Sequence, residues 1–179
     1  MKTHEFSIIA SGLNPEAEDF ETRFYDAGCN DATISFQKGH IIADFAREAE
    51  SLEDAIASAV DAVLAAGAKV DRVAPDPLVS QTDMAARAGL TRASLSNYSG
   101  GKRGSHFPAP IARVTSESPL WDWATVARWM YENKKLGKEA ALDAEIVRQA
   151  NVAICNGESH LSETLKKAAK EYSEELEAA

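Results

Sequence analysis

The chain has 179 residues, of which 45% are hydrophobic and 26% are charged, a composition typical of a folded protein with an apolar core. No segment approaches the roughly 18 consecutive apolar residues that a membrane span needs, and the N-terminus lacks the apolar region of a signal peptide. Cys29 and Cys155 fit no metal-binding or redox spacing. These features exclude a membrane protein and lead us to expect a cytoplasmic one.

The net charge of −9 is unevenly distributed along the chain. Residues 1–77 carry 6 Lys and Arg against 15 Asp and Glu, and residues 137–179 carry 5 against 9. Residues 78–136 carry 8 Lys and Arg against 4 Asp and Glu, a local charge of +4. Because phosphate binding depends on the local patch more than on the total, this basic middle segment remains compatible with nucleic-acid binding.

The first part of the chain alternates short strands with amphipathic helices. Strands are predicted at 6–10, 33–36, 41–45 and 69–73, with helices over 14–27 and 52–66. Asn14 and Ser51 are the expected N-caps, and Gly28 and Gly67 are the expected stops. The resulting βαββαβ order predicts a ferredoxin-like domain over residues 1–74, in which two helices cover one face of an antiparallel sheet.

A proline pair then separates this domain from the rest of the chain. Pro75 and Pro77 favour a stiff, extended connector, so we place the domain boundary there. Ferredoxin-like domains host unrelated functions, and this one could dimerise or sense a small molecule. It contains no phosphate-binding loop and no cluster of metal-ligating residues, so we expect neither a cofactor nor a metal.

The segment after the boundary has the pattern of a helix-turn-helix. Ser80 caps a helix over 81–88, Gly89 forms the turn, and Thr91 caps a second helix from Arg92 to Ser99. Ala85 is the small residue at which the two helices would cross. The apolar positions that would hold the interhelical angle are Met84, Ala88, Leu90, Leu95 and Tyr98.

The second helix exposes polar residues that suit DNA, and a basic loop follows it. Arg can read guanine and Asn can read adenine, whereas Ser and Thr commonly bind phosphates. Residues 99–105 add a glycine-rich loop in which backbone amides and two cations could approach phosphate. The candidate contacts of the helix and the loop are Thr91, Arg92, Ser94, Ser96, Asn97, Lys102 and Arg103.

A hairpin and a closing helix complete this middle segment. Strands are predicted at 111–114 and 120–123 around a turn, followed by a helix over 124–135. Arg113 would lie on this hairpin and could reach DNA. Trp121, Trp123 and Trp129 are expected in the core. Two helices, a hairpin and a last helix make a winged helix-turn-helix over residues 78–136.

The same segment resembles the winged helix-turn-helix of the MerR, AlpA and phage-excisionase group. The resemblance covers about a third of the chain and rests on Met84-Ala85, Gly89-Leu90, Phe107-Pro108-Ala109-Pro110, Trp121-Asp122-Trp123, Val126 and Trp129. It implies that the second helix enters the major groove and that Arg113 lies on the wing. MerR-type regulators carry a coiled coil after the DNA module, whereas here a ferredoxin-like domain precedes it. Glu117 on the wing turn also disfavours contact with phosphate.

Residues 137–179 are expected to form a helical tail. One helix is predicted over 138–150 and another carries Leu161, Leu165, Ala168, Tyr172 and Leu176 at helical spacing. This apolar seam could pack on its own chain, mediate dimerisation, or dock a partner protein.

The sequence therefore predicts an α+β protein that is not an enzyme. No nucleophile motif, metal spacing or dinucleotide fingerprint is present. We expect a sequence-specific, bacterial-type transcriptional regulator that binds double-stranded DNA as a homodimer. The alternative is an antitoxin-like interaction module whose acidic C-terminal helices dock a partner protein and whose DNA binding serves autoregulation.

Overall fold

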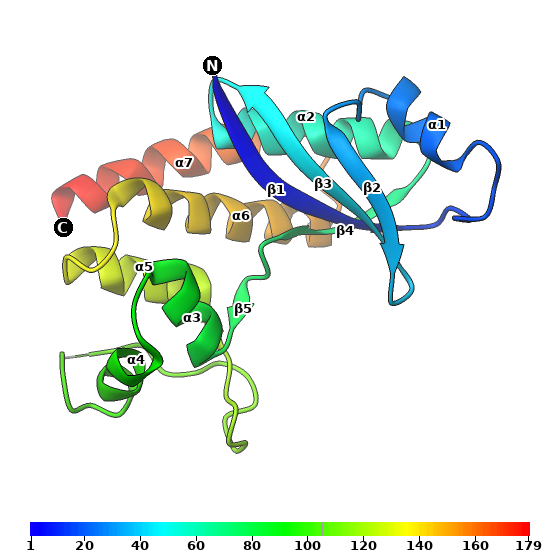
Figure 1. The fold of residues 1–179 in the computed structure, drawn as a ribbon. Coiled ribbons are helices and arrows are strands. Elements are labelled where there is room, and N and C mark those ends of the chain that lie inside the picture. The colour runs from blue at the N-terminus through cyan, green and yellow to red at the C-terminus, as the bar shows by residue number, and fades with distance from the viewer. Residues whose placement is uncertain (105) are drawn as a thin grey trace. The chain divides into compact units, whose positions relative to one another are not determined.

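The computed structural model describes residues 1–104 and 106–179 (Figure 1). Within them the fold is α+β, with a four-stranded antiparallel sheet, a two-stranded sheet and seven helices. Ser105, the last residue of the expected basic loop, lies outside the described residues. The chain divides into two compact units, one formed by Met1–Pro75 with Ile146–Glu171 and the other by Asp76–Glu145 with Tyr172–Ala179.

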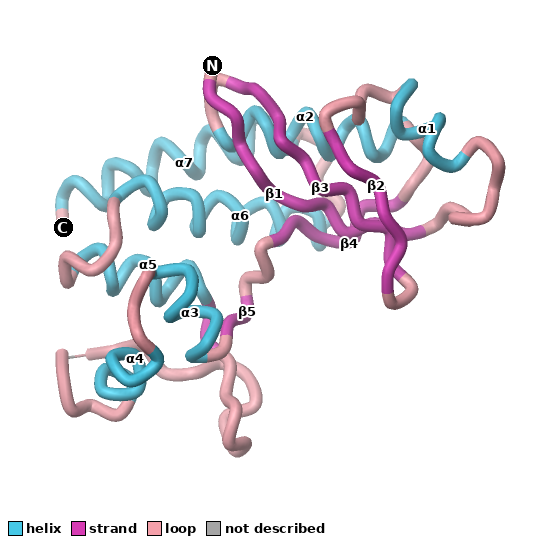
Figure 2. Tube along the Cα trace, viewed as in Figure 1, coloured by secondary structure: helices cyan, strands magenta, loops and turns pink. Residues whose placement is uncertain are grey.

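The first unit contains the four-stranded sheet, whose central strands are β1 and β3 (Figure 2). The strand order is β2-β3-β1-β4, and every neighbouring pair is antiparallel. In chain order its elements are β1 (Lys2–Ser11), α1 (Phe20–Asp26), β2 (Ala32–Gln37), β3 (His40–Ala49), α2 (Leu52–Ala65) and β4 (Lys69–Ala74). The βαββαβ order expected from the sequence is confirmed.

Alternation along the central strands buries one face of this sheet. In β1 the buried residues are Phe6, Ile8 and Ala10, and their partners across the β1–β3 register are Phe45, Ala43 and Ile41. Because directly opposed residues lie on the same face, these side chains form one apolar layer. The rings of Phe6 and Phe45 stack with centroids 5.4 Å apart. Helix α2 supplies matching apolar residues, and its N-cap Ser51 accepts a hydrogen bond from Asp54 N.

The first helix is shorter than its sequence pattern predicts. The expected helix over 14–27 is wrong at its start, because residues 14–19 form turns and α1 begins at Phe20. The Asn14 side chain accepts a hydrogen bond from Glu16 N at 3.0 Å, so it closes a local turn instead of capping the helix. Phe20 and Phe24 are buried, as the helical spacing predicts.

An ion pair holds the segment after α1 against the sheet. Arg47 donates to Asp31 through Nε at 2.7 Å and Nη2 at 2.8 Å. The same guanidinium also bonds to Gly28 O and Ser58 Oγ. Arg47 is the buried cation of β3, and this network satisfies it within the protein. The guanidinium lowers the pKa of Asp31.

The described residues of the second unit form two short strands, three complete helices and parts of the last two. Its elements are β5 (Leu78–Val79), α3 (Gln81–Ala88), α4 (Arg92–Ser99), β6 (Trp121–Asp122) and α5 (Trp123–Glu132). The helix boundaries around Gly89 agree with those expected from the sequence. The closing helix starts one residue earlier and ends three residues earlier than the expected range of 124–135.

Aromatic side chains form much of the core of the second unit. Trp121, Trp123 and Trp129 are all buried, as expected. Phe107 packs edge-on against Trp129, with ring centroids 4.9 Å apart. Trp121 Nε1 donates to Pro108 O at 2.9 Å, which satisfies its only polar group. These contacts anchor the segment around Phe107 and Pro108 to the helices.

The expected hairpin over 111–114 and 120–123 is reduced to one bridge, and the predicted strands do not extend beyond it. This bridge joins Ala112 to Leu120, and it is the only one between the two segments among the residues that the structure describes. Trp121 and Asp122 pair with Val79 and Leu78, so β6 belongs to a sheet with β5. The cause is at the start of α5, where Trp123 N donates to Pro77 O at 2.8 Å and holds the strand beside β5.

The last two helices are α6 (Lys138–Asn156) and α7 (Leu161–Ala178), and each supplies residues to both units. The tail over 137–179 is therefore not a separate unit, and α6 continues beyond the expected end at residue 150. The apolar seam of α7 is buried in this chain, as one of the three alternatives predicted, with Ala169 in place of Ala168. No helix in the described ranges is long and apolar enough to span a membrane.

Candidate nucleic-acid interface

Helices α3 and α4 are joined by a tight turn that the local sequence defines. Gly89 adopts φ +64°, the left-handed conformation that glycine enters without a steric penalty. Leu90 N donates to Ala85 O at 2.9 Å, which closes the C-terminus of α3. At the start of α4, Thr91 Oγ1 accepts a hydrogen bond from Ser94 N at 3.1 Å. The turn is therefore fixed by hydrogen bonds on both sides of Gly89.

A capping box fixes the start of α3. Ser80 Oγ accepts from Asp83 N, and the Asp83 carboxylate accepts from Ser80 N at 2.9 Å and from Ser80 Oγ at 2.7 Å. The hydrogen bonds from the Ser80 backbone and hydroxyl lower the pKa of Asp83. Asp83 therefore carries its charge at the helix N-terminus, where a carboxylate is stabilised.

Buried side chains hold α3 and α4 together. Met84 and Leu95 are fully buried, and Ala85 is 8% exposed where a small residue was expected. Gln81 Nε2 donates to Ser99 Oγ at 2.8 Å, which joins the first residue of α3 to the last residue of α4. The orientation of α4 is consequently set by packing as well as by the turn.

The polar residues at the outer face of α4 are either hydrogen-bonded within the helix start or exposed to solvent. Thr91 Oγ1 caps the helix and donates to Ser94 Oγ at 3.0 Å, so both hydroxyls are already engaged within the helix start. Arg92 and Ser96 are exposed, whereas Asn97 is half-buried. Arg92 is therefore the strongest candidate for base contact on this helix, ahead of the capping residues.

The basic loop begins directly at the C-terminal end of α4. The backbone amides of Lys102 and Arg103 both donate to Asn97 O, at 3.0 and 3.1 Å. This attachment places the two cations at the opposite end of α4 from Arg92, about 10 Å along a helix of this length. The structure thus distributes the candidate cations along α4 and does not gather them at one end.

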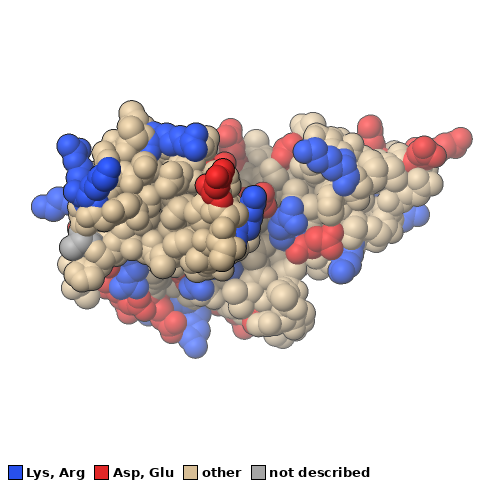
Figure 3. Space-filling model, turned by 90° about the horizontal axis from the view of Figure 1, so that it is seen from below, with Lys and Arg blue, Asp and Glu red and all other residues tan. Residues whose placement is uncertain are grey.

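The cations of the second unit differ in whether a carboxylate neutralises them. Arg128 is paired with Glu132 and Glu175, and Lys138 is paired with Glu177 at 2.5 Å. In contrast, Arg92, Lys102 and Arg103 are exposed and make no side-chain hydrogen bond or ion pair with a described residue. Figure 3 shows Lys and Arg side chains of this unit gathered on the surface at the left of the view.

Arg113 lies on the loop that follows the Ala112–Leu120 bridge. It has φ +51°, is exposed, and has no side-chain partner among the described residues. Ile111 and Val114 beside it are each 62% exposed. The expected wing residue is therefore accessible, although the strand that was to carry it is reduced to one bridge.

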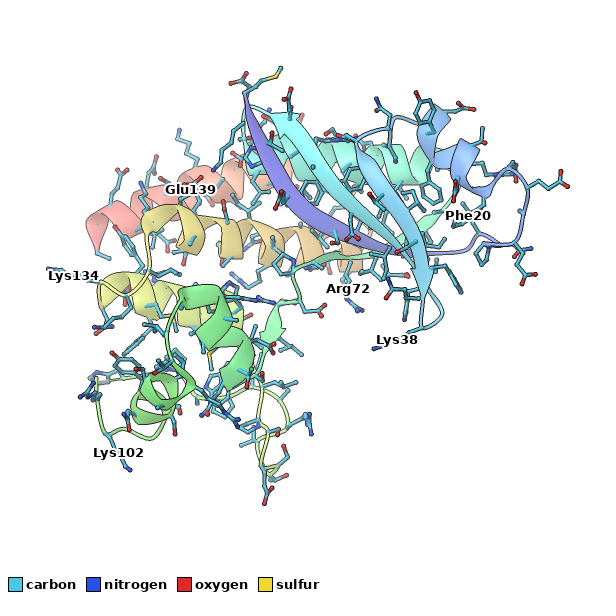
Figure 4. The ribbon with its side chains drawn as sticks, in the orientation of Figure 1. Phe20, Lys38, Arg72, Lys102, Lys134 and Glu139 are labelled. Carbon is cyan, nitrogen blue, oxygen red and sulfur yellow. The ribbon has the colours of Figure 1, made fainter. Side chains whose placement is uncertain are left out.

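Two further lysines at the C-terminal end of α5 escaped the sequence analysis. Lys135 Nζ lies 6.0 Å from the ring centroid of Tyr98, a residue of α4. Lys134 is exposed, and its side chain points away from the protein, as does that of Lys102 (Figure 4). Both lysines lie within the basic segment 78–136, and this position could have marked them as candidate phosphate contacts. Lys135 therefore joins Arg92, Lys102 and Arg103 as a cation located beside α4.

Arg87 does not belong to this exposed set. It is half-buried, and its guanidinium lies over the ring of Trp123, 5.5 Å from the centroid. Burial lowers the pKa of Arg87. Its Nη1 is buried without a hydrogen-bond partner among the described atoms. Arg87 contributes packing between α3 and α5 more than surface charge.

No group of three or more His, Cys, Asp or Glu side chains is placed to hold a metal ion within residues 1–104 and 106–179. Comparison with known proteins adds no further assignment. No protein-family model, curated protein or solved structure matches this chain.

Proposed function

We propose that this chain is a sequence-specific DNA-binding transcriptional regulator in which α4 enters the major groove. The observation that carries the proposal is the contrast between exposed, unpaired cations on and beside α4 and neutralised cations elsewhere in the same unit. Exposed cations without carboxylate partners create a local positive potential that attracts a polyanion. A duplex would supply that negative charge along the length of α4.

The rigidity of the helix pair supports the same proposal. Reading bases requires a helix held at a fixed angle by its supporting helix. Capping at Ser80 and Thr91, the left-handed Gly89, and the buried Met84 and Leu95 together meet this requirement. In this proposal Arg92 contacts a base edge, Lys102 and Arg103 contact phosphates, and Arg113 contacts the backbone from the wing.

The finer fold assignments belong to the same proposal. The strand order β2-β3-β1-β4 and the βαββαβ connectivity support a ferredoxin-like arrangement for the first unit. The α3–α4 pair, the Ala112–Leu120 bridge and α5 support a winged helix-turn-helix similar to the MerR, AlpA and excisionase group. One such module covers only a few base pairs, so we propose that the regulator acts as a homodimer on two half-sites.

The test is a binding titration on DNA chosen by the protein itself. Short duplexes selected by the full chain from a randomised pool would be titrated by fluorescence anisotropy, beside a scrambled duplex of equal composition. The titration would be repeated across a salt series. We expect preference for the selected duplex and a steep fall of affinity with salt, because phosphate contacts release counterions. Equal affinity for both duplexes would overturn sequence-specific binding.

A matched pair of variants shows whether the unpaired cations carry the binding. Lys102→Ala and Lys138→Ala remove the same charge from the same unit, but Lys138 is already neutralised by Glu177. We expect Lys102→Ala to weaken binding to all duplexes and to reduce the salt slope by about 1. Lys138→Ala should leave both quantities unchanged. Equal effects of the two variants would contradict the assignment of the interface to the α4 side.

No observation in the structure favours the alternative of a docking module. The apolar residues Leu161, Leu165, Tyr172 and Leu176 of α7 are already buried in this chain. A partner protein on this helix would have to bind its charged outer face.

A further inference from the structure

The two edges of the four-stranded sheet differ in whether another part of the chain hydrogen-bonds to them. The outer edge of β4 is closed by Asn151, whose side chain bonds to both backbone groups of Val73. At the other edge, β2 is the last strand in the order, and no described strand pairs with its outer side (Figure 1). An edge strand that nothing covers usually carries Lys, Pro or a bulge, which prevents another strand from pairing with it. The residues of β2, Ala-Thr-Ile-Ser-Phe-Gln, include no charge and no proline.

The hairpin geometry defines which backbone groups of β2 face outward. Gln37 pairs with His40 across the two-residue turn Lys38-Gly39, in which both residues have positive φ. Such a turn makes Gln37 and His40 a hydrogen-bonded pair, and the antiparallel ladder then alternates along the strand. The N–H and C=O groups of Ile34 and Phe36 therefore point to the free edge, where a further strand would satisfy them. Ala32 offers only its C=O there, because its N–H donates to Cys29 O at 3.1 Å.

Apolar side chains flank this free edge on the helix-covered side of the sheet. Ile34 is half-buried, Phe36 is 45% exposed, and Tyr25 of α1 is 67% exposed. Tyr25, Ala32 and Ile34 line a hollow of about 550 Å³ between α1 and β2. On the opposite face, β2 presents the hydroxyls of Thr33 and Ser35. The edge thus offers an apolar side and a polar side to an incoming strand.

We propose that a second copy of this chain pairs with β2, antiparallel, about a two-fold axis at Ile34. This register sets Ile34 opposite Ile34, Ala32 opposite Phe36, and Thr33 opposite Ser35. The N–H and C=O groups of Ile34 in one copy then meet those of Ile34 in the other, and the N–H of each Phe36 meets the C=O of Ala32 in the other copy. Because directly opposed residues share a face, the helices of both copies cover the same side of one continuous eight-stranded sheet.

Self-complementarity favours a second copy as the occupant of this edge. The first unit carries 17 Asp and Glu against 10 Lys and Arg, so a contact between two copies has to lie where these charges are absent. The β2 strand is the charge-free part of the sheet edge, and its apolar and hydroxyl positions are complementary to themselves under the two-fold axis. A basic or acidic partner strand would find no opposite charge on β2.

The experiment measures the mass of the full chain in solution without DNA, so its outcome is independent of the proposed DNA binding. Sedimentation equilibrium would compare the wild type with two variants altered at Thr33 and Ser35, which lie outside the apolar layer. Thr33→Lys with Ser35→Lys places lysines opposite lysines at the interface. Thr33→Glu with Ser35→Lys places a glutamate opposite a lysine at each of the same positions. Circular dichroism would establish that both variants retain the wild-type fold.

We expect the wild type to have twice the 19.3 kDa mass of the chain. The double-lysine variant should dissociate, with a dimer Kd raised at least about tenfold, although it makes the chain less negative overall. The Glu and Lys variant should remain a dimer. A monomeric wild type, a double-lysine variant that stays dimeric, or dissociation of both folded variants would each overturn pairing about Ile34.

Discussion

Asn151 and Val73 are joined by two hydrogen bonds although 78 residues separate them in the chain. Val73 N donates to Asn151 Oδ1 at 2.8 Å, and Asn151 Nδ2 donates to Val73 O at 3.0 Å. The side-chain amide therefore replaces a neighbouring strand near the C-terminal end of the β4 edge. Because Asn151 is a residue of α6, these bonds also tie that helix to the sheet, and Asn151 Nδ2 donates in addition to Val147 O within the helix.

Replacement of Asn151 by alanine tests this closure. Asn151→Ala leaves both backbone groups of Val73 without these partners, and we expect a loss of about 2 kcal/mol in the free energy of unfolding. Urea denaturation gives this value, and amide exchange at Val73 should become faster. Val152→Ala, which trims an exposed neighbour on the same helix, is the control. Similar losses in both variants would show that the amide contributes little.

The Asp31–Arg47 ion pair predicts a dependence of stability on pH. Asp31→Asn leaves the buried Arg47 without its charge partner, and we expect a loss of about 2 kcal/mol near neutral pH, less than for a fully buried pair because the Asp31 side chain is 29% exposed. The pKa of Asp31 lies below its ordinary value of 3.8 in the folded state. The stabilisation is therefore present above that value and is lost as the pH falls through the lowered pKa.

Chemical unfolding of wild type and Asp31→Asn at a series of pH values checks this prediction. The stability difference should be constant at neutral pH and should shrink as the solution is acidified below 3.8. Asp61→Asn, which removes an exposed carboxylate from α2, serves as the control for the change in net charge. A difference that does not change with pH would mean that Asp31 acts through shape and not through its charge.

Gly101 and Gly104 form a matched pair for separating backbone strain from steric contact. Their φ angles are +72° and +73°, but a Cβ on Gly104 would lie 2.8 Å from Trp129 Cζ2, whereas a Cβ on Gly101 meets nothing within 4 Å. Gly101→Ala should cost about 1 kcal/mol from the left-handed backbone alone. Gly104→Ala should cost more, because Trp129 is buried and cannot move freely. Equal losses in thermal unfolding would show that Trp129 yields without penalty.

Arg92 is predicted to provide sequence discrimination at the proposed interface. Because it is exposed on α4 and unpaired with any described residue, Arg92→Ala should leave stability unchanged. Its affinity for the selected duplex should fall by about 1–3 kcal/mol, with a much smaller effect on scrambled DNA. Anisotropy titrations of both duplexes measure the two effects. A uniform loss on both would reassign Arg92 from a base to a phosphate contact.

Features that depend on a few neighbouring residues were determined by the sequence itself. The caps at Ser51, Ser80 and Thr91 and the left-handed turn at Gly89 are where their residue types predict them. The strands expected at 6–10 and 41–45 likewise lie within β1 and β3. Each of these signals arises from hydrogen bonds within one turn of helix, or from the two-residue period of a strand, so no distant partner is needed.

Pairings between distant segments were decided only by the tertiary structure. Strand β6 pairs with β5 and not with residues 111–114, Asn151 closes β4, and Ala169 replaces Ala168 in the buried seam of α7. The same holds for the cations, since nothing in the sequence separates Lys138, paired with Glu177, from the unpaired Lys102. Such choices depend on which groups compete for one partner after the chain has folded, and local patterns carry no information about that competition.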